Sequence, residues 1–404
     1  MAGLYIHIPF CRSRCIYCAF YSTTSLAWRD RYVDALCREW QLRTAAPGGS
    51  LTDGQSVALQ SVAESITTIY LGGGTPSQLT PAQLQRLFSV LPTGATEVTI
   101  EVNPDDVTAE YAAVLQRLGV NRVSMGAQTF EDQRLHFLRR RHTAAQVPQA
   151  VRLLREAGIG NISVDLMYGF PGETLADWQR DIEAVLALDV EHLSAYCLTI
   201  EEGTPLHRML NGDCPSCEKR SGLQGDCPLN EELERQMYET LIDRLTAAGY
   251  EHYEISNFAR PGRRSRHNSS YWTDVPYIGL GAAAHSYMSA PTVLGGSAAE
   301  TRAVRSWNVS DLRTYVEAIE RGERPSEQEV LDADTHYNDR ITTALRTSDG
   351  LDLTTLSDHH RSYCLQEAGR FIKDGLLHLD VDRLSLTRRG LFVSDMVMSS
   401  LMLV

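Results

Sequence analysis

The sequence has almost no lysine. Its 404 residues include only Lys219 and Lys373, so nearly all of its positive charge is arginine. A Schiff-base mechanism needs a reactive lysine amine, so the composition argues against that chemistry. Arginine stays protonated at all ordinary pH values and makes planar, bidentate contacts with carboxylates.

Excess positive charge is also missing, because 51 Asp and Glu oppose 38 Lys and Arg and give a formal charge of −13. This balance argues against a nucleic acid or an anionic membrane as the main partner. No run of about 18 apolar residues is present, so no integral membrane segment is expected. The nine cysteines are odd in number and scattered, which favours a reducing compartment. With no cleavable signal ahead of the first motif, we expect a cytoplasmic protein.

Three of the cysteines lie close together near the start of the chain. Cys11, Cys15 and Cys18 have the spacing C-x3-C-x2-C within LYIHIPFCRSRCIYCAFYS. A [4Fe–4S] cluster normally takes four thiolates, so three would leave one iron open to an exogenous ligand. The alternative is a zinc site with His7 as the fourth ligand. The spacing favours the cluster.

The first half of the chain alternates between short apolar segments and amphipathic ones. Such alternation with short connections implies parallel strands and right-handed crossovers. Six units predict an α/β fold with a partial (β/α)6 barrel. Strands are expected at 4–8, 66–71, 97–102, 122–125, 161–166 and 192–198, and helices at 26–43, 83–91, 109–118, 144–157 and 176–188.

Polar residues and glycines follow the ends of these expected strands, where functional loops of barrels gather. Each alone has an ordinary interpretation as a capping or solvated group, but their shared rim position indicates a ligand site. Glycines let a ligand approach the backbone, because no Cβ intervenes. Carboxylates there can accept both hydroxyls of a ribose, and an arginine can pair with a carboxylate. The rim residues are Gly73, Gly74, Glu101, Gln128, Arg140 and Asp165.

Residues 211–230 are rich in Gly, Pro and Ser and are expected to form a surface insertion. Cys214, Cys217 and Cys227 could bind a metal with His207, but a loop is the favoured interpretation. A helix at 231–248 and a strand at 250–256 follow.

Next comes a loop with the motif HNSSYW, which contains His267, Tyr271 and Trp272. A histidine beside aromatic residues suits an axial haem ligand. From the chemistry of the residues alone, an ordinary hydrogen-bonded loop histidine is the favoured interpretation.

The last part of the chain has shorter features that suggest a mostly helical, winged-helix-like domain. We expect domains at 1–290 and 291–404. From residue 335 onward eight Lys and Arg face nine Asp and Glu, which is not the charge of a DNA reader. A lid or docking domain is favoured. Helices are expected at 309–321, 337–346, 363–374 and 389–402, with a hairpin at 376–379 and 383–386.

Taken together, these motifs resemble one branch of the radical S-adenosylmethionine superfamily: oxygen-independent coproporphyrinogen III oxidase and the haem chaperone family HemW. The resemblance covers nearly the whole chain, in the ordered motifs YIHIPFC, YLGGGTPS, IEVNPDDVT, GVNRVSMGAQTF, LMYGFPGET, LTIEEGTPL, YEISNFARP and HNSSYW. It implies that Cys11, Cys15 and Cys18 hold the cluster and that the C-terminal part is a HemN_C-like domain. The residues implied to line the S-adenosylmethionine site are Tyr5, Gly73, Gly74, Thr75, Glu101, Gln128, Arg140 and Asp165.

Two sequence features distinguish the oxidase family from the HemW family. The oxidase has a further cysteine two positions after the third ligand and an extension before the motif, whereas here Phe20 takes that position and the motif begins at residue 11. Both features resemble HemW, as does the HNxxYW motif, which that family associates with haem binding through His267, Tyr271 and Trp272. The resemblance therefore implies a chaperone that binds haem and delivers it to an acceptor such as a respiratory haem enzyme. The alternatives are decarboxylation of coproporphyrinogen III, a haem-degrading radical methyltransferase and a zinc-only structural protein.

Overall fold

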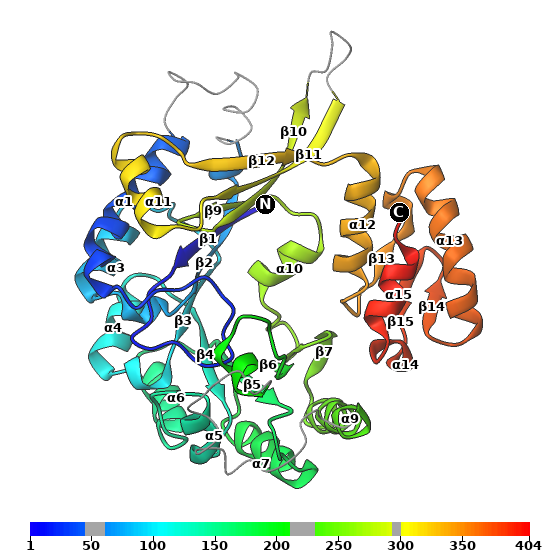
Figure 1. Cartoon of the computed structure of the whole chain (residues 1–404), viewed down its shortest axis with the longest axis horizontal. Helices are drawn as coiled ribbons and strands as arrows, with labels where there is room; N and C mark the ends of the chain where they lie inside the picture. The colour runs from blue at the N-terminus through cyan, green and yellow to red at the C-terminus, as the bar shows by residue number, and fades with distance from the viewer. Residues whose placement is uncertain (45–60, 211–230, 293–299) are drawn as a thin grey trace.

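The architecture comes from a computed structural model, which describes residues 1–44, 61–210, 231–292 and 300–404. The expected insertion at 211–230, with its three cysteines, lies outside the described residues. Figure 1 shows a strongly curved sheet with helices on its outer side and a smaller, mostly helical region across its open side.

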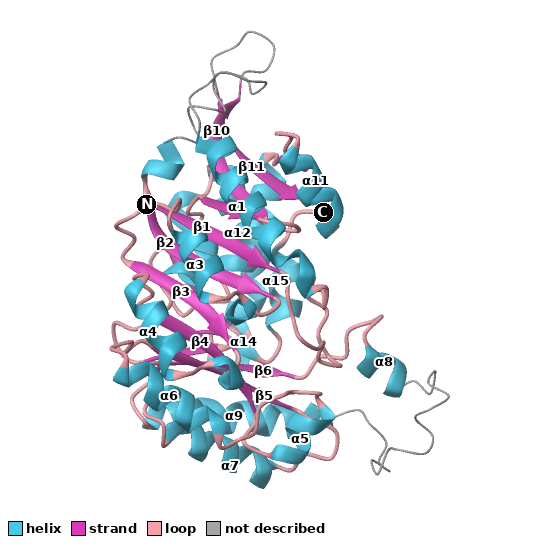
Figure 2. Cartoon of the chain, turned by 90° about the vertical axis from the view of Figure 1, so that its left-hand side faces the viewer, coloured by secondary structure: helices cyan, strands magenta, loops and turns pink. Residues whose placement is uncertain are grey.

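Six parallel strands form the centre of this sheet, in their order along the chain. Figure 2 shows that they run in the same direction, so that their carboxyl ends meet on one side. The prediction of a partial parallel barrel is confirmed. The strands are β1 (Ala2–Ile8), β2 (Ile66–Gly73), β3 (Glu97–Val102), β4 (Arg122–Gln128), β5 (Ile162–Tyr168) and β6 (His192–Cys197).

Crossover helices cover the outer face of the sheet (Figure 1). Two of them begin with a capping box: Thr80 exchanges hydrogen bonds with Gln83, and Thr174 does so with Asp177. Each box satisfies backbone N–H groups that the first helical turn leaves without a partner. These helices are α1 (Arg29–Thr44), α3 (Pro81–Phe88), α4 (Ala109–Arg117), α5 (Asp132–Phe137), α6 (Gln146–Glu156) and α7 (Leu175–Leu186).

The sheet continues beyond the six strands on both sides, to twelve strands in the described residues. Beside β1 lies a further parallel strand, followed by three antiparallel ones. On the β6 side, α8 (Pro205–Leu210) and α9 (Glu231–Ala247) precede two short antiparallel strands. These added strands are β9 (Tyr277–Leu280), β10 (His285–Thr292), β11 (Glu300–Asn308), β12 (Ser326–Val330), β7 (Glu251–Glu254) and β8 (Asn257–Ala259).

A buried carboxylate holds the extension to the barrel. Glu39 on α1 is fully buried, and Arg43, one turn later, lies 2.7 Å from it. The same carboxylate accepts hydrogen bonds from the backbone N–H of Gly281 (2.9 Å) and the hydroxyl of Tyr315 (2.6 Å). Tyr315 belongs to α11 (Leu312–Glu320). Helix α1, the first crossover helix, therefore holds Gly281 and α11 in place, although both follow more than 200 residues later.

The C-terminal region has a hydrophobic core of its own, built around Tyr337, Ile341 and Phe371. The expected hairpin is present as β14 and β15, but the helix expected at 389–402 is two helices. The boundary expected at residue 290 falls inside β10, and the large sheet continues to Val330. We propose to divide the chain after Val330. The elements are α12 (Ala333–Ala344), β13 (Leu351–Asp352), α13 (Asp358–Lys373), β14 (Leu377–Asp380), β15 (Arg383–Leu386), α14 (Arg388–Leu391) and α15 (Ser394–Leu401).

Within the described residues, every helix is too short or too polar to span a bilayer.

Candidate functional site

The three cysteines lie on the loop that follows β1. Cys11 is buried, Cys15 and Cys18 are partly exposed, and all three are free thiols. Burial raises the pKa of Cys11 and of Cys18, and negative charge on the neighbouring Cys15 raises both further. Binding to iron would offset this cost of ionising the thiols, because metal ligation stabilises the thiolate form.

The donor set on this loop fits a cluster better than a single zinc ion. Among the described residues, no group of three or more His, Cys, Asp or Glu side chains is arranged to hold one metal ion. His7 has both ring nitrogens engaged, Nδ1 with the Tyr5 hydroxyl (2.9 Å) and Nε2 with the Tyr21 carbonyl (3.0 Å). A cubane cluster binds each thiolate through a different iron, so its ligands need not converge on one point.

Glycines at the end of β2 allow the cysteine loop to come close. The backbone N–H of Gly74 donates to the Ile8 carbonyl at 2.9 Å. A Cβ on Gly74 would lie 2.8 Å from the carbonyl oxygen of Pro9 and 3.1 Å from Cys11 Sγ. At Gly73, with φ +115°, a Cβ would lie 2.6 Å from the His7 ring. The close approach therefore requires glycine at both positions.

The next residue along, Thr75, reaches the first cysteine: its Oγ1 lies 3.4 Å from Cys11 Sγ. This contact joins the two predicted parts of the site, the cysteine loop and the glycine-rich end of β2.

Two carboxylates lie inside the barrel below the glycines. Glu101 accepts hydrogen bonds from the Tyr70 hydroxyl (2.8 Å) and the Gly73 N–H (3.1 Å). Burial raises its pKa to about 7, and the charge of Asp165 adds to this rise. Asp165 accepts from Ser124 Oγ at 3.3 Å, and burial raises its pKa to about 6. Ligand hydroxyls that donate hydrogen bonds to Glu101 and Asp165 would stabilise the ionised forms of both carboxylates.

Arg140 and Gln128 lie on the same rim. Arg140 donates to Asn103 Oδ1 (2.8 Å) and to the Gly126 carbonyl, and another of its nitrogens lies 3.8 Å from Cys15 Sγ. Its Nε has no hydrogen-bond partner among the described residues. Gln128 is buried with φ +69° at an irregularity of β4. A guanidinium with a spare donor beside a cluster ligand suits a carboxylate of a bound ligand.

Tyr5 lies deeper in the barrel and is partly buried, and its ring is stacked on that of Tyr70 with centroids 6.3 Å apart. Burial raises the pKa of its phenol, so the hydroxyl remains a neutral hydrogen-bond donor. The structure thus brings the expected rim residues and the cysteine loop to one end of the barrel.

The HNSSYW motif lies elsewhere, on a short helix inside the curve of the sheet (Figure 1). The expectation of a loop is wrong: residues Arg266–Trp272 form α10, which begins where Ser265 Oγ accepts the Asn268 N–H. Helix α10 packs on β1 and β2, and the His267 ring lies so near Gly3 that a Cβ there would be 3.1 Å from it. Gly3 is at the start of β1, so the histidine lies toward the end of the barrel opposite the cysteines.

His267 itself is 1% exposed. Its Nδ1 lies 2.9 Å from Thr68 Oγ1 and its Nε2 lies 2.9 Å from the Tyr271 hydroxyl. Burial lowers the pKa of His267 to about 3, and the charge of Arg122 lowers it further. The imidazole is neutral with both nitrogens engaged, and in this conformation it holds the Tyr271 hydroxyl.

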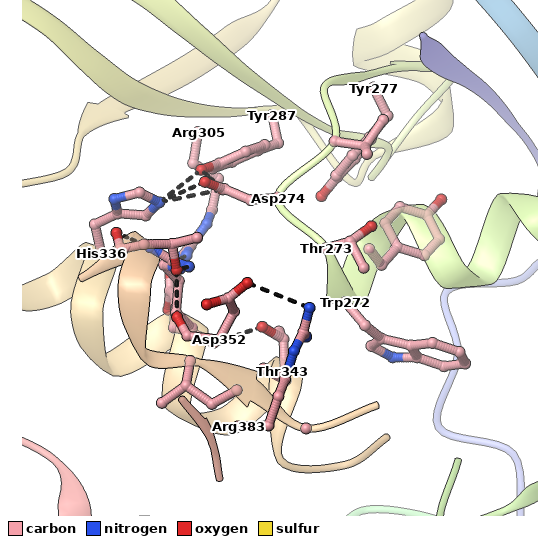
Figure 3. A pocket seen from close by; sticks show the side chains of 18 residues that line it. Trp272, Thr273, Asp274, Tyr277, Tyr287, Arg305, His336, Thr343, Asp352 and Arg383 are labelled. Atoms are coloured by element: carbon pink, nitrogen blue, oxygen red, sulfur yellow. Dashed lines mark hydrogen bonds and ion pairs between the residues drawn. The ribbon is translucent and has the colours of Figure 1, made fainter. Parts of the chain in front are cut away.

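Tyr271 and Trp272 line a cavity of about 470 Å³ between α10 and the C-terminal region (Figure 3). A second cavity, of about 590 Å³, also has Trp272 in its wall. The first is lined mainly by aromatic and charged side chains from both regions of the chain. They include Tyr277, Tyr287, Arg305, His336, Asp339, Arg340, Asp352 and Arg383.

Apart from Tyr271 and Trp272, the residues of this cavity were not identified from the sequence, and neither were Tyr70 and Arg122. Tyr70 lies two residues before Gly72 on β2, so the two positions are on the same face of the sheet. This spacing could have identified Tyr70 as a residue of the site. Arg122 is 1% exposed, and Nε and one terminal nitrogen have no hydrogen-bond partner among the described residues. An arginine at the start of a strand gives no local sign of burial. The cavity residues come from distant segments and share no local pattern.

Known protein families match both regions of the chain. The model of the Radical SAM superfamily matches residues 5–185, and that of the HemN C-terminal domain matches residues 331–393. The heme chaperone HemW of Bacillus subtilis is 32% identical over 98% of this chain and 98% of its own length. The chain belongs to the HemW family. HemW of Mycobacterium tuberculosis is 33% identical, covering 99% of this chain and 94% of its own.

Membership of the HemW family, within the radical SAM superfamily, implies a [4Fe–4S] cluster and S-adenosylmethionine. A mitochondrial member from Bos taurus, Radical S-adenosyl methionine domain-containing protein 1, is 30% identical over 99% of this chain and 87% of its own. Among solved structures, coproporphyrinogen III oxidase (HemN) from Escherichia coli has a TM-score of 0.75 at 21% identity, covering 99% of this chain and 89% of its own. At that identity the likeness establishes the fold.

Proposed function

We propose that this protein is a haem chaperone that binds haem, carries a [4Fe–4S] cluster with S-adenosylmethionine, and delivers haem to an acceptor such as a respiratory haem enzyme. The observation that carries the proposal is the similarity to heme chaperones named HemW over almost the full length of both chains. Phe20 supports it, because the oxidase has a cysteine at that position. The Phe20 side chain is 72% exposed on the cysteine loop. We propose a cytoplasmic location.

For the cluster, the proposed ligands are Cys11, Cys15 and Cys18, which would leave one iron free to take the methionine end of S-adenosylmethionine. When bound, the reduced cluster supplies an electron to the sulfonium. Arg140 is suited to bind the methionine carboxylate, because its guanidinium lies near Cys15 and keeps a free donor. Glu101 and Asp165 are suited to accept the ribose hydroxyls. Tyr5, Gly73, Gly74, Thr75 and Gln128 complete the proposed lining.

For haem, we propose contact with Tyr271 and Trp272, both of which line the cavity beside α10. His267, expected from the motif to be a haem residue, would act indirectly by holding the Tyr271 hydroxyl. Keeping the haem residues on a helix packed inside the barrel gives the carrier a rigid wall against which a flat ligand can bind.

Haem binding and transfer by the anaerobically reconstituted protein tests the proposal. We expect saturable binding of haem in an absorbance titration, followed by loss of that spectrum when an apo-form acceptor is added. Protein that carries its cluster but binds no haem, or never releases it to any acceptor, would contradict the assignment.

A second candidate is decarboxylation of coproporphyrinogen III, favoured by the HemN fold at a TM-score of 0.75. It requires catalytic turnover of coproporphyrinogen with S-adenosylmethionine and a reductant. A carrier instead retains supplied haem without changing it, so product analysis separates the two functions.

A further inference from the structure

The cavity beside α10 has one aromatic wall, held in place by its own packing. The rings of Tyr271 and Tyr277 meet edge to face with centroids 4.6 Å apart, and Tyr277 is stacked with Tyr287 at 6.2 Å. Trp272 continues this wall and lies edge to face with Tyr253 at 6.0 Å. Figure 3 shows Trp272 and Tyr277 on the same side of the cavity. Aromatic rings fixed in this way offer a flat ligand a large contact area with little loss of conformational entropy.

The opposite side of the cavity carries cations, most of which already have a carboxylate partner. Arg305 pairs with Asp339. Arg383 lies 3.2 Å from Asp352. These pairs, drawn as dashed lines in Figure 3 where both partners are shown, leave little net charge on their part of the wall.

His336 Nε2 lies 3.1 Å from a carboxylate oxygen of Asp274. Each of the three aspartates therefore has a basic group within ion-pair distance, whereas one further cation of the wall acts on Asp274 and Asp352 from a greater distance.

Arg340 on α12 is that further cation. It donates to the carbonyl oxygen of Thr355 (2.9 Å) and to the hydroxyl of the same residue, and both acceptors are uncharged. In the described part of the chain, no carboxylate lies within ion-pair distance of Arg340. A guanidinium has five N–H donors, so this one retains donors for a ligand carboxylate.

From these two walls we propose that the cavity is the tetrapyrrole site, in which Trp272 and Tyr277 hold the face of the macrocycle and Arg340 binds its carboxylates. The inference rests on the proposed function and assigns its ligand site. A volume of about 470 Å³ lies in the usual range for small-ligand pockets, about 300–1,000 Å³. The adjoining cavity, which shares Trp272 and Arg383, extends the space along the same wall.

This site separates the cargo from the cofactor. Helix α10 packs on β1 and β2 near the start of β1, whereas the cysteine loop follows the carboxyl end of β1. Between them lie two partly buried groups, Tyr70 and Glu101. Haem held here would not contact S-adenosylmethionine bound at the cysteine loop, which is the arrangement a carrier requires.

The test titrates the full chain with three probes: ferric haem, metal-free protoporphyrin IX and protoporphyrin IX dimethyl ester. The variants are Trp272→Leu and Arg340→Gln, with Trp28→Leu and Arg370→Gln as controls outside the cavity. We expect Trp272→Leu to weaken all three probes about tenfold, which corresponds to about 1.4 kcal/mol. Arg340→Gln should weaken the two dicarboxylates similarly but leave the ester unchanged, because the ester offers no anion to the guanidinium. The controls should match the unmodified protein.

The ester also reports folding, since an Arg340→Gln protein that still binds it has an intact cavity. If the chain binds haem with an affinity that neither cavity variant changes, the site assignment is wrong and the haem-chaperone proposal stands. If Arg340→Gln weakens the ester as much as the dicarboxylates, the proposed carboxylate contact is wrong. If the unmodified protein binds neither haem nor porphyrin, the proposed function itself fails.

Discussion

The imidazole of His267 is stacked on the ring of Tyr70, with centroids 5.1 Å apart and planes 25° apart. Tyr70 in turn donates its hydroxyl to Glu101, which accepts the Gly73 N–H beside the cysteine loop. The HNSSYW helix is therefore packed against the same partly buried groups that support the proposed cofactor site. Its histidine contributes to the interior of the barrel.

Replacing His267 by alanine should therefore destabilise the fold. The substitution removes a buried ring and leaves Thr68 and Tyr271 without a hydrogen-bond partner, so we expect a loss of about 2–4 kcal/mol in the free energy of unfolding. Urea denaturation measures this loss, with the exposed His359→Ala as the control. The folded fraction of His267→Ala should bind haem with an unchanged absorbance spectrum. A variant of normal stability whose haem spectrum shifts would show instead that His267 ligates the iron.

The pKa of Glu101, raised by burial to about 7, predicts a pH dependence of stability. As pH rises from about 4.5 to 7, the unfolded chain ionises this group before the folded chain does, so folding loses up to about 3 kcal/mol. The contribution is fully present below pH 4.5 and lost above 7. In Glu101→Gln the group stays neutral, so the variant should gain stability relative to the unmodified protein between pH 5 and pH 8. If Glu101→Gln changes the free energy of unfolding by the same amount at pH 5 and at pH 8, the raised pKa is wrong.

Gly74→Ala should prevent assembly of the cluster without unfolding the barrel. The added Cβ would lie 2.8 Å from the Pro9 backbone, so the cysteine loop must move away from β2. We expect iron and acid-labile sulfide to fall severalfold after reconstitution. Gly160→Ala is the matched control, because its Cβ would meet nothing within 4 Å. Equal iron content in the two variants would mean that the close approach of the loops is not required.

Removing the buried carboxylate of Glu39 should loosen the extension of the sheet. Glu39→Gln leaves Arg43, whose side chain is 2% exposed, without its charge partner. The expected cost is about 3–5 kcal/mol, as for other broken buried pairs. Glu320→Gln breaks a half-exposed pair with Arg31, which water and salt screen, so it should cost much less than Glu39→Gln. Similar unfolding free energies for the two variants would rule out this role of Glu39.

The barrel could be predicted because its six central strands are apolar runs bounded by turn residues, and because the first five are each followed by an amphipathic helix. Of the strands beyond them, β7 lies within the strand expected at 250–256, but most could not be predicted. All five residues of β12 are exposed, so Ser326–Val330 has no alternating pattern to detect. The helix at His267 was missed because HNSSYW is short and lacks an apolar repeat. Tertiary packing on β1 and β2 holds it in place.

The residues of the candidate site were likewise predictable only in part. Cys11 and Gly74 are neighbours in space because each ends a strand of the same parallel pair, and adjacent motifs predict such proximity. The cavity depends on Trp272 and Arg340, which belong to different regions of the chain. No local spacing relates them, so only the folded structure could indicate that they face one space.

The most direct test of the account is to offer haem and coproporphyrinogen III, in parallel and without oxygen, to the reconstituted protein with S-adenosylmethionine and a reductant. The account predicts that haem is bound, remains chemically intact and passes to an apo-form acceptor, while coproporphyrinogen is recovered unchanged. Sustained formation of protoporphyrinogen IX with release of carbon dioxide would contradict it and identify the protein as a decarboxylase.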